Sequence, residues 1–415
     1  MIMEKLNVFM LNELVGRLCL KPDNNYIFTY DEKYLKLESA QPVSLSMPLK
    51  DESYDHDGAR SFFTNLLPEG DLRVRIAREK KISEDNDFLL LKAIGGECAG
   101  AVSLAENESP PVDENEYEHL SEHDLIKMIG SSLRKPLLIS HDELRLSLAG
   151  AQNKIPLRFK NEQFYLPKGN SPSTHILKLI SPGFEGLVEN ELFCMKLAKR
   201  AGLDVPDVFI WEAGSCRAFI IERYDRYYDS REWIHRLHQE DFCQITGTGP
   251  NRKYENEGGP GIQTCIDVIN RFCSVPILEK KKFINWVLFN FFIGNCDAHA
   301  KNISMLYVNQ EIKLAPFYDI VSTLIFPELS KKMAMHIGGK KQIDYLFKIH
   351  WERFANDVDI KYSTLQYELV SMAERLKIVS GELQETFIDT QDAAEVSSKI
   401  INVIRKQIRC IESLA

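Results

Sequence analysis

The stretch Asp297-Ala298-His299-Ala300-Lys301-Asn302, followed by Asp319 within Ala315-Pro316-Phe317-Tyr318-Asp319-Ile320, decides how the fold of this chain is interpreted. An Asp, an Asn five positions later and a second Asp after a short pair of strands form a set that phosphoryl transfer from Mg-ATP requires. In that chemistry the first Asp orients and deprotonates the attacking hydroxyl, whereas the Asn amide oxygen and the second carboxylate hold magnesium ions. We therefore predict a kinase active site, with Asp297 as catalytic base and with Asn302 and Asp319 as magnesium ligands.

The residues between Asn302 and Asp319 predict a β-hairpin. Ile303–Tyr307 and Glu311–Ala315 are two short β-type runs, and Val308-Asn309-Gln310 connects them. Such a hairpin brings Asn302 and Asp319 side by side at its open end, where both can reach one metal ion.

Composition narrows the class of protein. With 415 residues, 44% of them hydrophobic, the chain can form two or three domains with real cores. A net charge of −9 argues against a chain that coats nucleic acid by itself. No apolar run approaches the roughly 20 residues of a membrane span, and the first residues lack a signal-peptide layout. The nine cysteines are scattered and never form CxxC, which favours reduced thiols in a cytoplasmic protein.

The chain divides into four stretches, which together predict an α+β protein. Residues 1–105 have the mixed pattern of a small domain, and residues 106–117 form an acidic, proline-containing linker. Residues 118–225 are rich in strand patterns, and residues 226–415 are mostly helical apart from the hairpin. A strand-rich lobe followed by a helical lobe with both aspartates has the layout of a two-lobed kinase.

Several helices and strands are predicted with approximate bounds. The expected strands are Lys5–Met10, Tyr26–Tyr30, Leu157–Phe159, Phe164–Leu166, His175–Leu179 and Ala218–Ile221. The expected helices are Gly58–Leu67, Leu72–Glu79, Ser121–Ser131, Leu187–Ala201, a buried helix over Phe283–Gly294, and Asp392–Leu414.

A second stretch, residues 145–154, is a candidate phosphate loop. The small residues Ala149, Gly150 and Ala151 let backbone N–H groups approach an anion, and Lys154 could reach a phosphate. A single glycine does not make a GxGxxG motif, so the stretch taken alone favours a tight turn before a strand. Its position ahead of the other motifs favours the phosphate loop.

Lys178 lies inside the otherwise apolar strand His175–Leu179. A lysine is costly to bury without an anionic partner, and in a kinase an ATP phosphate and a helix carboxylate are its natural partners. Glu191, at the start of the following helix, is the candidate carboxylate, and Glu189 is the alternative. The other interpretation is that Lys178 extends to solvent from an edge strand.

The segment Phe219–Arg226 ends the strand-rich region, where a kinase has the connection between its lobes. Backbone groups of that connection commonly hydrogen-bond the adenine edge, but a charged strand end is the default interpretation of this segment. His299 has no second His or Cys at ligand spacing, which argues against zinc and favours a structural or phosphate-facing role. His336 and Gly338-Gly339 are expected in a loop, without an assigned role.

These fragments, in this order, resemble the HipA family of toxin serine/threonine kinases. The amino-terminal shared stretches are Pro42–Leu49, Phe62–Glu69 and Gly100–Val102. The others are Ser147–Lys154, Pro167–Gly169, Thr174–Lys178, Glu222–Asp225, Gln239–Gln244, Lys253-Tyr254-Glu255, Gly258–Gly261, Asp297–Asn302 and Pro316–Asp319. The resemblance covers most of the chain, and beyond about residue 345 no stretch matches a family motif.

The resemblance implies a two-lobed, HipA-like protein-kinase fold and a cytosolic bacterial enzyme that uses ATP and Mg2+. The enzyme would phosphorylate a cellular protein, with aminoacyl-tRNA synthetases as the implied target class, and thereby arrest growth. By motif position the catalytic base is Asp297, the magnesium ligands are Asn302 and Asp319, and Lys178 holds ATP phosphates. The phosphate loop comprises Ala149, Gly150, Ala151, Gln152, Asn153 and Lys154; the adenine site comprises Glu222, Arg223 and Tyr224; the remaining nucleotide-site candidates are His299, Ala300, Lys301 and Tyr318.

The resemblance also implies regulation and a partner. Ser147 matches the family serine that is autophosphorylated, and a dianion there could pull the loop from the ATP pocket and silence the kinase; a serine that stabilises a turn is the alternative. Family members are neutralised by a small helix-turn-helix antitoxin that binds operator DNA. The chain would therefore contact DNA only through that partner, and no membrane is involved.

Two further functions stay open at this point. A small-molecule or lipid kinase can carry the same Asp, Asn and Asp arrangement, and it would place phosphate on a metabolite. A kinase-like module without transfer activity would only co-repress with its antitoxin. The presence of Asp297, Asn302 and Asp319 together weighs against the second alternative, because a module without activity does not need all three.

Overall fold

A computed structural model of the chain describes residues 4–96, 98–108, 115–132, 154–178, 185–214, 216–387 and 390–413. Its contacts form two compact units. Unit 1 comprises residues 1–179, 211–251 and 306–309, and unit 2 comprises residues 180–210, 252–305 and 310–415. Neither unit is one continuous stretch of chain. The sequence predicted four consecutive stretches instead, and that division stays a prediction.

Unit 1 begins with a four-stranded antiparallel sheet of order β3-β2-β1-β4. Its strands are β1 (Lys5–Met10), β2 (Glu13–Leu20), β3 (Tyr26–Tyr30) and β4 (Val102–Ala105). Leu11 and Asn12 join β1 to β2 with φ of 51° and 68°, which is the conformation of a tight two-residue hairpin turn. The predicted strands at Lys5–Met10 and Tyr26–Tyr30 are confirmed.

Three helices follow β3 in this part of unit 1: α1 (His56–Asn65), α2 (Gly70–Lys80) and α3 (Asp87–Ile94). Asp55 caps α1 by accepting the Gly58 N–H at 2.9 Å, which satisfies one of the free donors of the first turn. The core contains Phe28, Phe62 and Phe63, all fully buried, and burial of each such ring stabilises the fold by about 1.5–3 kcal/mol. The two predicted helices correspond to α1 and α2.

The second sheet has six strands in the order β5-β7-β6-β8-β10-β9. Its strands are β5 (Tyr117–Leu120), β6 (Lys154–Lys160), β7 (Gln163–Pro167), β8 (His175–Lys178), β9 (Val208–Ala213) and β10 (Cys216–Glu222), and α4 (Glu122–Ser132) follows β5. The strand that carries Lys178 is therefore interior, because β6 and β10 pair with its two sides. The alternative of an edge strand was wrong.

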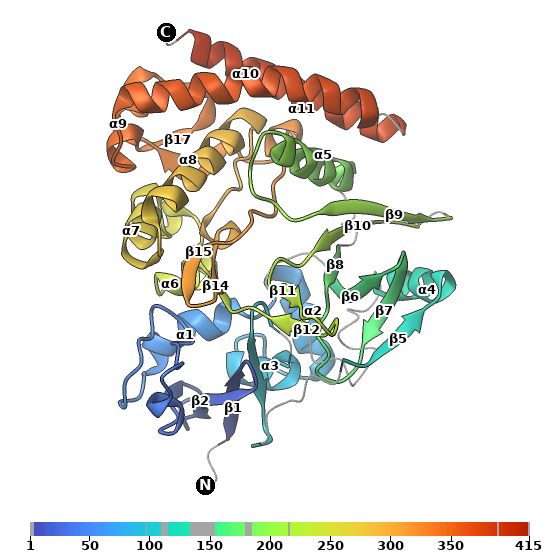
Figure 1. Ribbon diagram of the computed structural model, residues 1–415, viewed down its shortest axis with the longest axis vertical. Coiled ribbons are helices and arrows are strands. Elements are labelled where there is room, and N and C mark those ends of the chain that lie inside the picture. Colours follow the sequence, from blue (N-terminus) through green and yellow to red (C-terminus); the bar gives the residue numbers. More distant parts are fainter. Residues whose placement is uncertain are drawn as a thin grey trace. The chain divides into compact units, whose positions relative to one another are not determined.

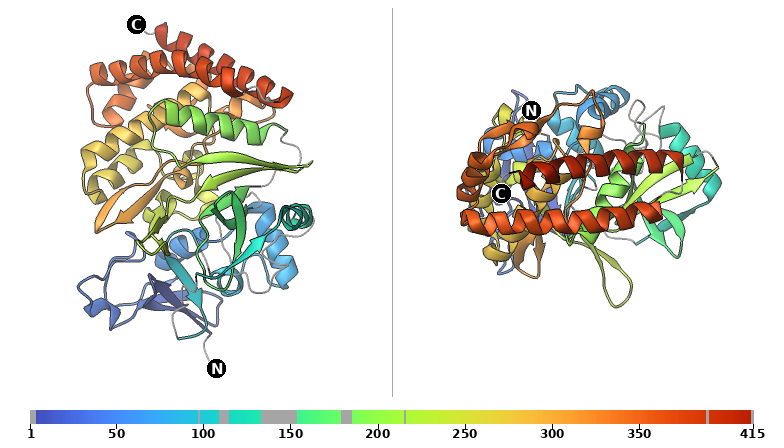
Figure 2. Two further views of the ribbon diagram at one scale, coloured as in Figure 1. Left: turned by 45° about the vertical axis from the view of Figure 1, so that its right-hand side comes forward. Right: turned by 90° about the horizontal axis from the view of Figure 1, so that it is seen from above.

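Unit 2 is mainly helical. Its helices are α5 (Leu187–Arg200), α7 (Ile262–Phe272), α8 (Pro276–Ile293), α9 (Lys348–Asp357), α10 (Tyr362–Phe387) and α11 (Gln391–Glu412). The long helices α10 and α11 lie side by side and antiparallel, as Figures 1 and 2 show. The buried helix predicted at Phe283–Gly294 is the second half of α8, which ends at Gly294 with φ 71°. The predicted helices Leu187–Ala201 and Asp392–Leu414 correspond to α5 and α11.

The predicted hairpin after Asn302 is confirmed. It consists of β14 (Ser304–Val308) and β15 (Glu311–Leu314). The turn contains only Asn309 and Gln310, with φ of 49° and 68°, because Val308 continues the strand. At the open end the Ala315 N–H donates to the Ser304 carbonyl at 2.8 Å.

The expectation of a mostly helical chain after residue 226 was incomplete. This region also contains β11 (Arg226–Tyr228), β12 (Ile234–Arg236), β13 (Gln239–Asp241), the four-residue α6 (Phe242–Ile245), β16 (Lys332–Ile337) and β17 (Lys340–Gln342). Strands of three residues, such as β11, are too short to show alternation. Along the whole described chain, short 3-10 helices occupy Tyr34–Lys36, Pro250–Arg252, Glu255–Glu257, Ala300–Asn302, Thr323–Ile325 and Ile343–Tyr345. His336 lies in β16 rather than in a loop, whereas Gly338-Gly339 form the turn that follows, as expected.

Candidate active site

The predicted site residues belong to both units. Those in unit 1 are Lys154, Lys178, Glu222, Arg223 and Tyr224. Those in unit 2 are Asp297, His299, Ala300, Lys301, Asn302, Tyr318 and Asp319. Ser147 and residues 149–153 of the predicted phosphate loop lie outside the described residues.

Asp297 projects from a turn that two buried asparagines fix. Asn295 accepts the Asp297 N–H on Oδ1 at 3.0 Å, and its Nδ2 donates to Asn290 Oδ1 at 2.8 Å. Asn290 in turn donates to the Trp286 carbonyl at 2.9 Å, which ties the turn to the last part of α8. Asp297 itself is exposed, and its Oδ1 accepts the hydroxyl of Tyr254 at 2.7 Å. The result is an accessible carboxylate on a rigid backbone.

His299 and Asn302 close the next turn of this segment. The His299 N–H donates to Asn302 Oδ1 at 3.0 Å, and the Asn302 N–H donates to the His299 carbonyl at 2.9 Å. Both residues are buried, so the amide of Asn302 is held in one orientation. An amide oxygen has two lone pairs, and one of them remains for a cation.

Tyr318 joins this turn to the residues before Asp319. Its hydroxyl donates to the Lys301 carbonyl at 2.8 Å and lies 2.8 Å from Ser304 Oγ. The residue before Asn302 and the residue before Asp319 are therefore linked directly. Asn302 and Asp319 consequently belong to one local structure, although 17 positions separate them.

Asp319 has an unusual backbone conformation, with φ 54°. The left-handed region is uncommon for residues other than glycine, and it is found disproportionately at functional sites. Contacts within unit 2 hold the backbone on both sides of Asp319. The Phe317 N–H donates to the Asp204 carbonyl at 2.8 Å, and the side chain of Asn190 binds the backbone of Ser322.

The donor set fits magnesium. The Asn302 amide and the Asp319 carboxylate supply hard oxygen atoms, and Mg2+ in phosphoryl-transfer sites is usually bound through one or two carboxylates together with substrate phosphates. The orientation of the Asn302 amide and the link through Tyr318 are the structural observations that support this fit.

In unit 1, Lys154 and Lys178 are directly opposite on β6 and β8. Opposite residues of an antiparallel pair point to the same face, and like charges there repel. Lys178 is only 5% exposed, and its ammonium group lies 5.7 Å from the ring centroid of Phe219. Two ammonium groups at these positions favour an anion beside them, as the predicted phosphate contacts require. The predicted pairing of Lys178 with Glu191 or Glu189 stays a prediction.

Arg223 is engaged inside unit 1. Its Nε and Nη2 donate to the two carboxylate oxygens of Asp225 at 2.9 and 2.8 Å, and Nη1 donates to Ser173 Oγ at 2.9 Å. Burial alone would raise the pKa of Asp225, but the charges of Arg223 and Arg226 outweigh it and hold this pKa well below the usual range. The Arg223 N–H also donates to the Thr174 carbonyl at 2.8 Å. The assignment of residues 222–224 to an adenine site stays a prediction.

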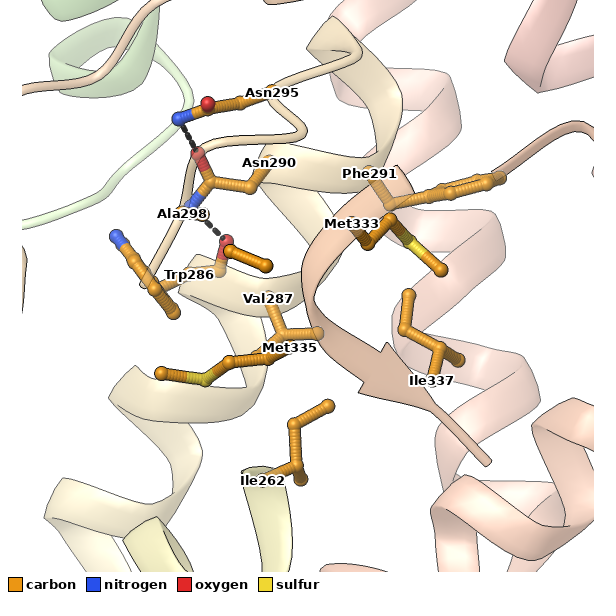
Figure 3. Close-up of a pocket in the computed structure, with 11 residues that line it drawn as sticks. Ile262, Trp286, Val287, Asn290, Phe291, Asn295, Ala298, Met333, Met335 and Ile337 are labelled. Atoms are coloured by element: carbon orange, nitrogen blue, oxygen red, sulfur yellow. Dashed lines mark hydrogen bonds between the residues drawn. The ribbon is translucent and has the colours of Figure 1, made fainter. Parts of the chain in front are cut away.

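A small cavity lies beside the turn that carries Asp297 (Figure 3). It has a volume of about 30 Å3, which is enough for a water molecule. The polar pair Asn290 and Asn295 lies at one end together with Ala298, and Met333, Met335 and Ile337 of β16 also line the cavity. The cavity shows that β16 packs against the segment that carries Asp297.

Sequence reasoning gave no role to Tyr254, Asn190, Asn290 or Asn295. Tyr254 belongs to a stretch that was noted only for its resemblance, and Asn190 stands between the two glutamates that were considered as partners of Lys178. The contacts of Tyr254 and Asn190 span 43 and 132 positions, so residue spacing gave no signal for them. The contacts of Asn290 and Asn295 are local, within five positions.

Two family models match the chain. The HipA-like C-terminal domain matches residues 146–386, and the HipA N-terminal domain matches residues 6–105. The chain belongs to the HipA family. This confirms the resemblance found in the sequence.

Two relatives of this HipA family member are described as kinases. A "Putative kinase Y4mE" of Sinorhizobium fredii is 36% identical over 394 residues, which is 93% of this chain and 94% of the relative. The "Serine/threonine-protein kinase toxin HipA" of Shewanella oneidensis is 29% identical over 357 residues, which is 83% of this chain and 82% of the relative.

A solved structure of the Shewanella oneidensis toxin–antitoxin system, with HipA, HipB and operator DNA, matches with a TM-score of 0.85. The sequences are 24% identical, and the match covers 99% of each chain. The predicted α+β, HipA-like fold is thereby confirmed. In the described part of this HipA family chain, no helix is both long and apolar enough to cross a membrane.

Proposed function

We propose that this HipA family chain is a Mg-ATP-dependent serine/threonine protein kinase that acts as the toxin of a toxin–antitoxin module. The observation that carries the proposal is the exposed carboxylate of Asp297 on a fixed turn, within the same local structure as Asn302 and Asp319. A relative described as a serine/threonine-protein kinase toxin supports the choice of a protein hydroxyl as acceptor.

In the proposed reaction Asp297 orients the acceptor hydroxyl and takes its proton as the new oxygen–phosphorus bond forms. Asn302 and Asp319 would hold magnesium, which when bound neutralises charge on the ATP phosphates. Lys154 and Lys178 would stabilise the negative charge of the phosphates. Both lysines belong to β strands, so their positions are set before substrate binds.

We assign the remaining nucleotide contacts to the residues that match the HipA family motifs. The backbone of residues 222–224 would meet the adenine, and residues 149–153, together with Lys154, would surround the phosphates. His299, Ala300, Lys301 and Tyr318 would shape the site. His299 binds the Asn302 amide, and Tyr318 binds the Lys301 carbonyl.

The proposed partners are a helix-turn-helix antitoxin and a protein substrate, with an aminoacyl-tRNA synthetase as the proposed target and a cytoplasmic location. The structural neighbour that includes HipB and operator DNA supports an antitoxin partner. DNA would be contacted through that antitoxin. Autophosphorylation of Ser147 would silence the kinase by moving the phosphate loop.

The proposal is tested with a lysate of the protein's own cells. Wild-type protein and the Asp297→Asn variant are each incubated with Mg-ATP and lysate, and new phosphosites are mapped by mass spectrometry. The proposal predicts new phosphoserine or phosphothreonine on a cellular protein, and on Ser147, with the wild type only. Phosphate found only on a metabolite would instead indicate a small-molecule kinase, and no transfer at all would indicate a binding module.

A further inference from the structure

The loop that follows the short helix Pro250–Arg252 carries Tyr254 to the candidate catalytic base. The Tyr254 hydroxyl donates to Asp297 Oδ1 at 2.7 Å. The ring of Tyr254 also lies edge-on to His299, with centroids 5.4 Å apart and planes at 76°. Tyr254 therefore contacts both the carboxylate of Asp297 and the turn that orients Asn302.

The backbone of Tyr254 is fixed by its own loop. Its carbonyl accepts the N–H groups of Glu257 and Gly259, each at 2.9 Å. Gly259 allows this close approach, because a Cβ there would lie 2.2 Å from the Arg252 carbonyl oxygen. The loop is consequently a compact turn rather than an extended strand.

The next residue anchors the loop to β16. Glu255 Oε2 accepts the His336 N–H at 2.6 Å, and Oε1 lies 3.1 Å from His336 Nδ1. His336 Nε2 lies 3.0 Å from Asn256 Oδ1. The carboxylate of Glu255 also fills the space beside Gly261, where a Cβ would be 2.8 Å from the carboxyl carbon. The two residues that follow Tyr254 thus anchor its loop to β16.

We propose that Tyr254 is a positioning residue for the catalytic base. This inference rests on the proposed kinase function and deepens it. With Oδ1 held by the tyrosine hydroxyl, the carboxylate cannot rotate freely, and Oδ2 is the oxygen that faces an incoming acceptor. The acceptor proton then moves to Oδ2 while the acceptor oxygen binds the γ-phosphorus and the bond to the departing ADP oxygen breaks.

A hydroxyl at hydrogen-bond distance from the base is also where an acceptor would lie. The anchored loop favours positioning, because an acceptor must approach the phosphate and then leave with it. Tyr254 is instead fixed through its own carbonyl and through Glu255. Mass spectrometry of the protein after incubation with Mg-ATP separates the two roles, and phosphate on Tyr254 would overturn the positioning role.

The test is the Tyr254→Phe variant, which removes one hydroxyl and keeps the ring. Tyr367→Phe is the matched control, because Tyr367 is 71% exposed on α10 of the same unit. Transfer of labelled γ-phosphate to protein in heat-treated host lysate is measured at varied ATP concentration, and thermal unfolding confirms that each variant folds. We expect kcat of Tyr254→Phe to fall by about 10- to 100-fold, with the KM for ATP unchanged. The control should match the wild type.

A double-mutant cycle shows whether Tyr254 acts through Asp297. In the Asp297→Asn background, Tyr254→Phe should change the residual rate by less than about twofold. Full activity of Tyr254→Phe beside an inactive Asp297→Asn would overturn the positioning role and leave the proposed function intact. An equal loss in both backgrounds would also overturn it. A wild type that transfers no phosphate would instead contradict the proposed function itself.

Discussion

Asn190 on α5 binds the backbone of Ser322 with both atoms of its side-chain amide. Nδ2 donates to the Ser322 carbonyl at 2.9 Å, and Oδ1 accepts the Ser322 N–H at 2.8 Å. Both residues are fully buried. Ser322 follows Asp319 by three positions, so this pair of hydrogen bonds holds the segment that leaves the candidate metal ligand.

Replacing Asn190 by alanine should therefore destabilise unit 2. The variant leaves a buried N–H and a buried C=O of Ser322 without their partner, which costs about 2–4 kcal/mol of unfolding free energy. The exposed Asn402 on α11 supplies the control, since Asn402→Ala should change stability by less than about 0.5 kcal/mol. Urea unfolding of both variants measures the difference, and equal effects would show that the Asn190 contact contributes little.

The turn between β16 and β17 offers a matched pair of glycine substitutions. Gly338 and Gly339 both have positive φ, of 54° and 77°. A Cβ at Gly338 would lie 1.9 Å from the His350 carbonyl oxygen, whereas a Cβ at Gly339 meets no atom within 4 Å.

Both alanine variants should lose about 1 kcal/mol through the left-handed backbone alone. Gly338→Ala should lose at least about 2 kcal/mol more, because the backbone of His350 must move. Thermal unfolding of the two variants tests this expectation. A Gly339→Ala variant as unstable as Gly338→Ala would mean that the close approach to His350 is not what makes Gly338 necessary.

The buried carboxyl of Glu240 predicts a dependence of stability on pH. It accepts Ser44 Oγ–H at 2.6 Å, the Leu45 N–H at 2.9 Å and the Tyr307 hydroxyl at 2.5 Å. Burial raises its pKa from 4.5 to about 7, although these hydrogen bonds act in the opposite direction. The folded state therefore binds more protons than the unfolded state between these two values. The contribution of Glu240 to stability is fully present below pH 4.5 and is lost as the pH rises through about 7.

Glu240→Gln isolates this contribution, because glutamine stays neutral at every pH. The stability of the variant relative to wild type should rise by up to about 3 kcal/mol between about pH 4.5 and about pH 7.5. Urea unfolding of both proteins across this range gives the difference directly. Other groups also make stability depend on pH. Burial lowers the pKa of His175 and His238 to about 4, for example. Their effects are common to both proteins, so they largely cancel when the two unfolding free energies are subtracted. A difference that does not change with pH would contradict the raised pKa.

The parts predicted well from the sequence are those with strong local signals. The hairpin after Asn302 was predicted because two β-type runs flank a turn. Helix α11 was predicted because its apolar spacing continues over many turns. Strands β11, β12 and β13 were missed because three residues cannot show a period of two.

The chemistry assigned to the candidate site stays a prediction, and the contacts that support its residues could not be predicted from the sequence. Asp297, Asn302 and Asp319 are recognisable because phosphoryl transfer needs those residue types at such spacing. Tyr254 and Asn190 act through contacts across 43 and 132 positions, and only the folded chain brings such residues together. The same holds for Lys178, whose interior position follows from the pairing of β8 with both β6 and β10.

The rate of γ-phosphate transfer tests most directly whether Asp297 is the base of a phosphotransferase. Asp297→Asn keeps the shape of the side chain and an oxygen that can accept the Tyr254 hydroxyl, and the residue is exposed, so the fold should persist. We predict that the initial rate of transfer from labelled Mg-ATP to protein falls by at least about 100-fold, with ATP binding unchanged. A variant that transfers phosphate at the wild-type rate would contradict the account.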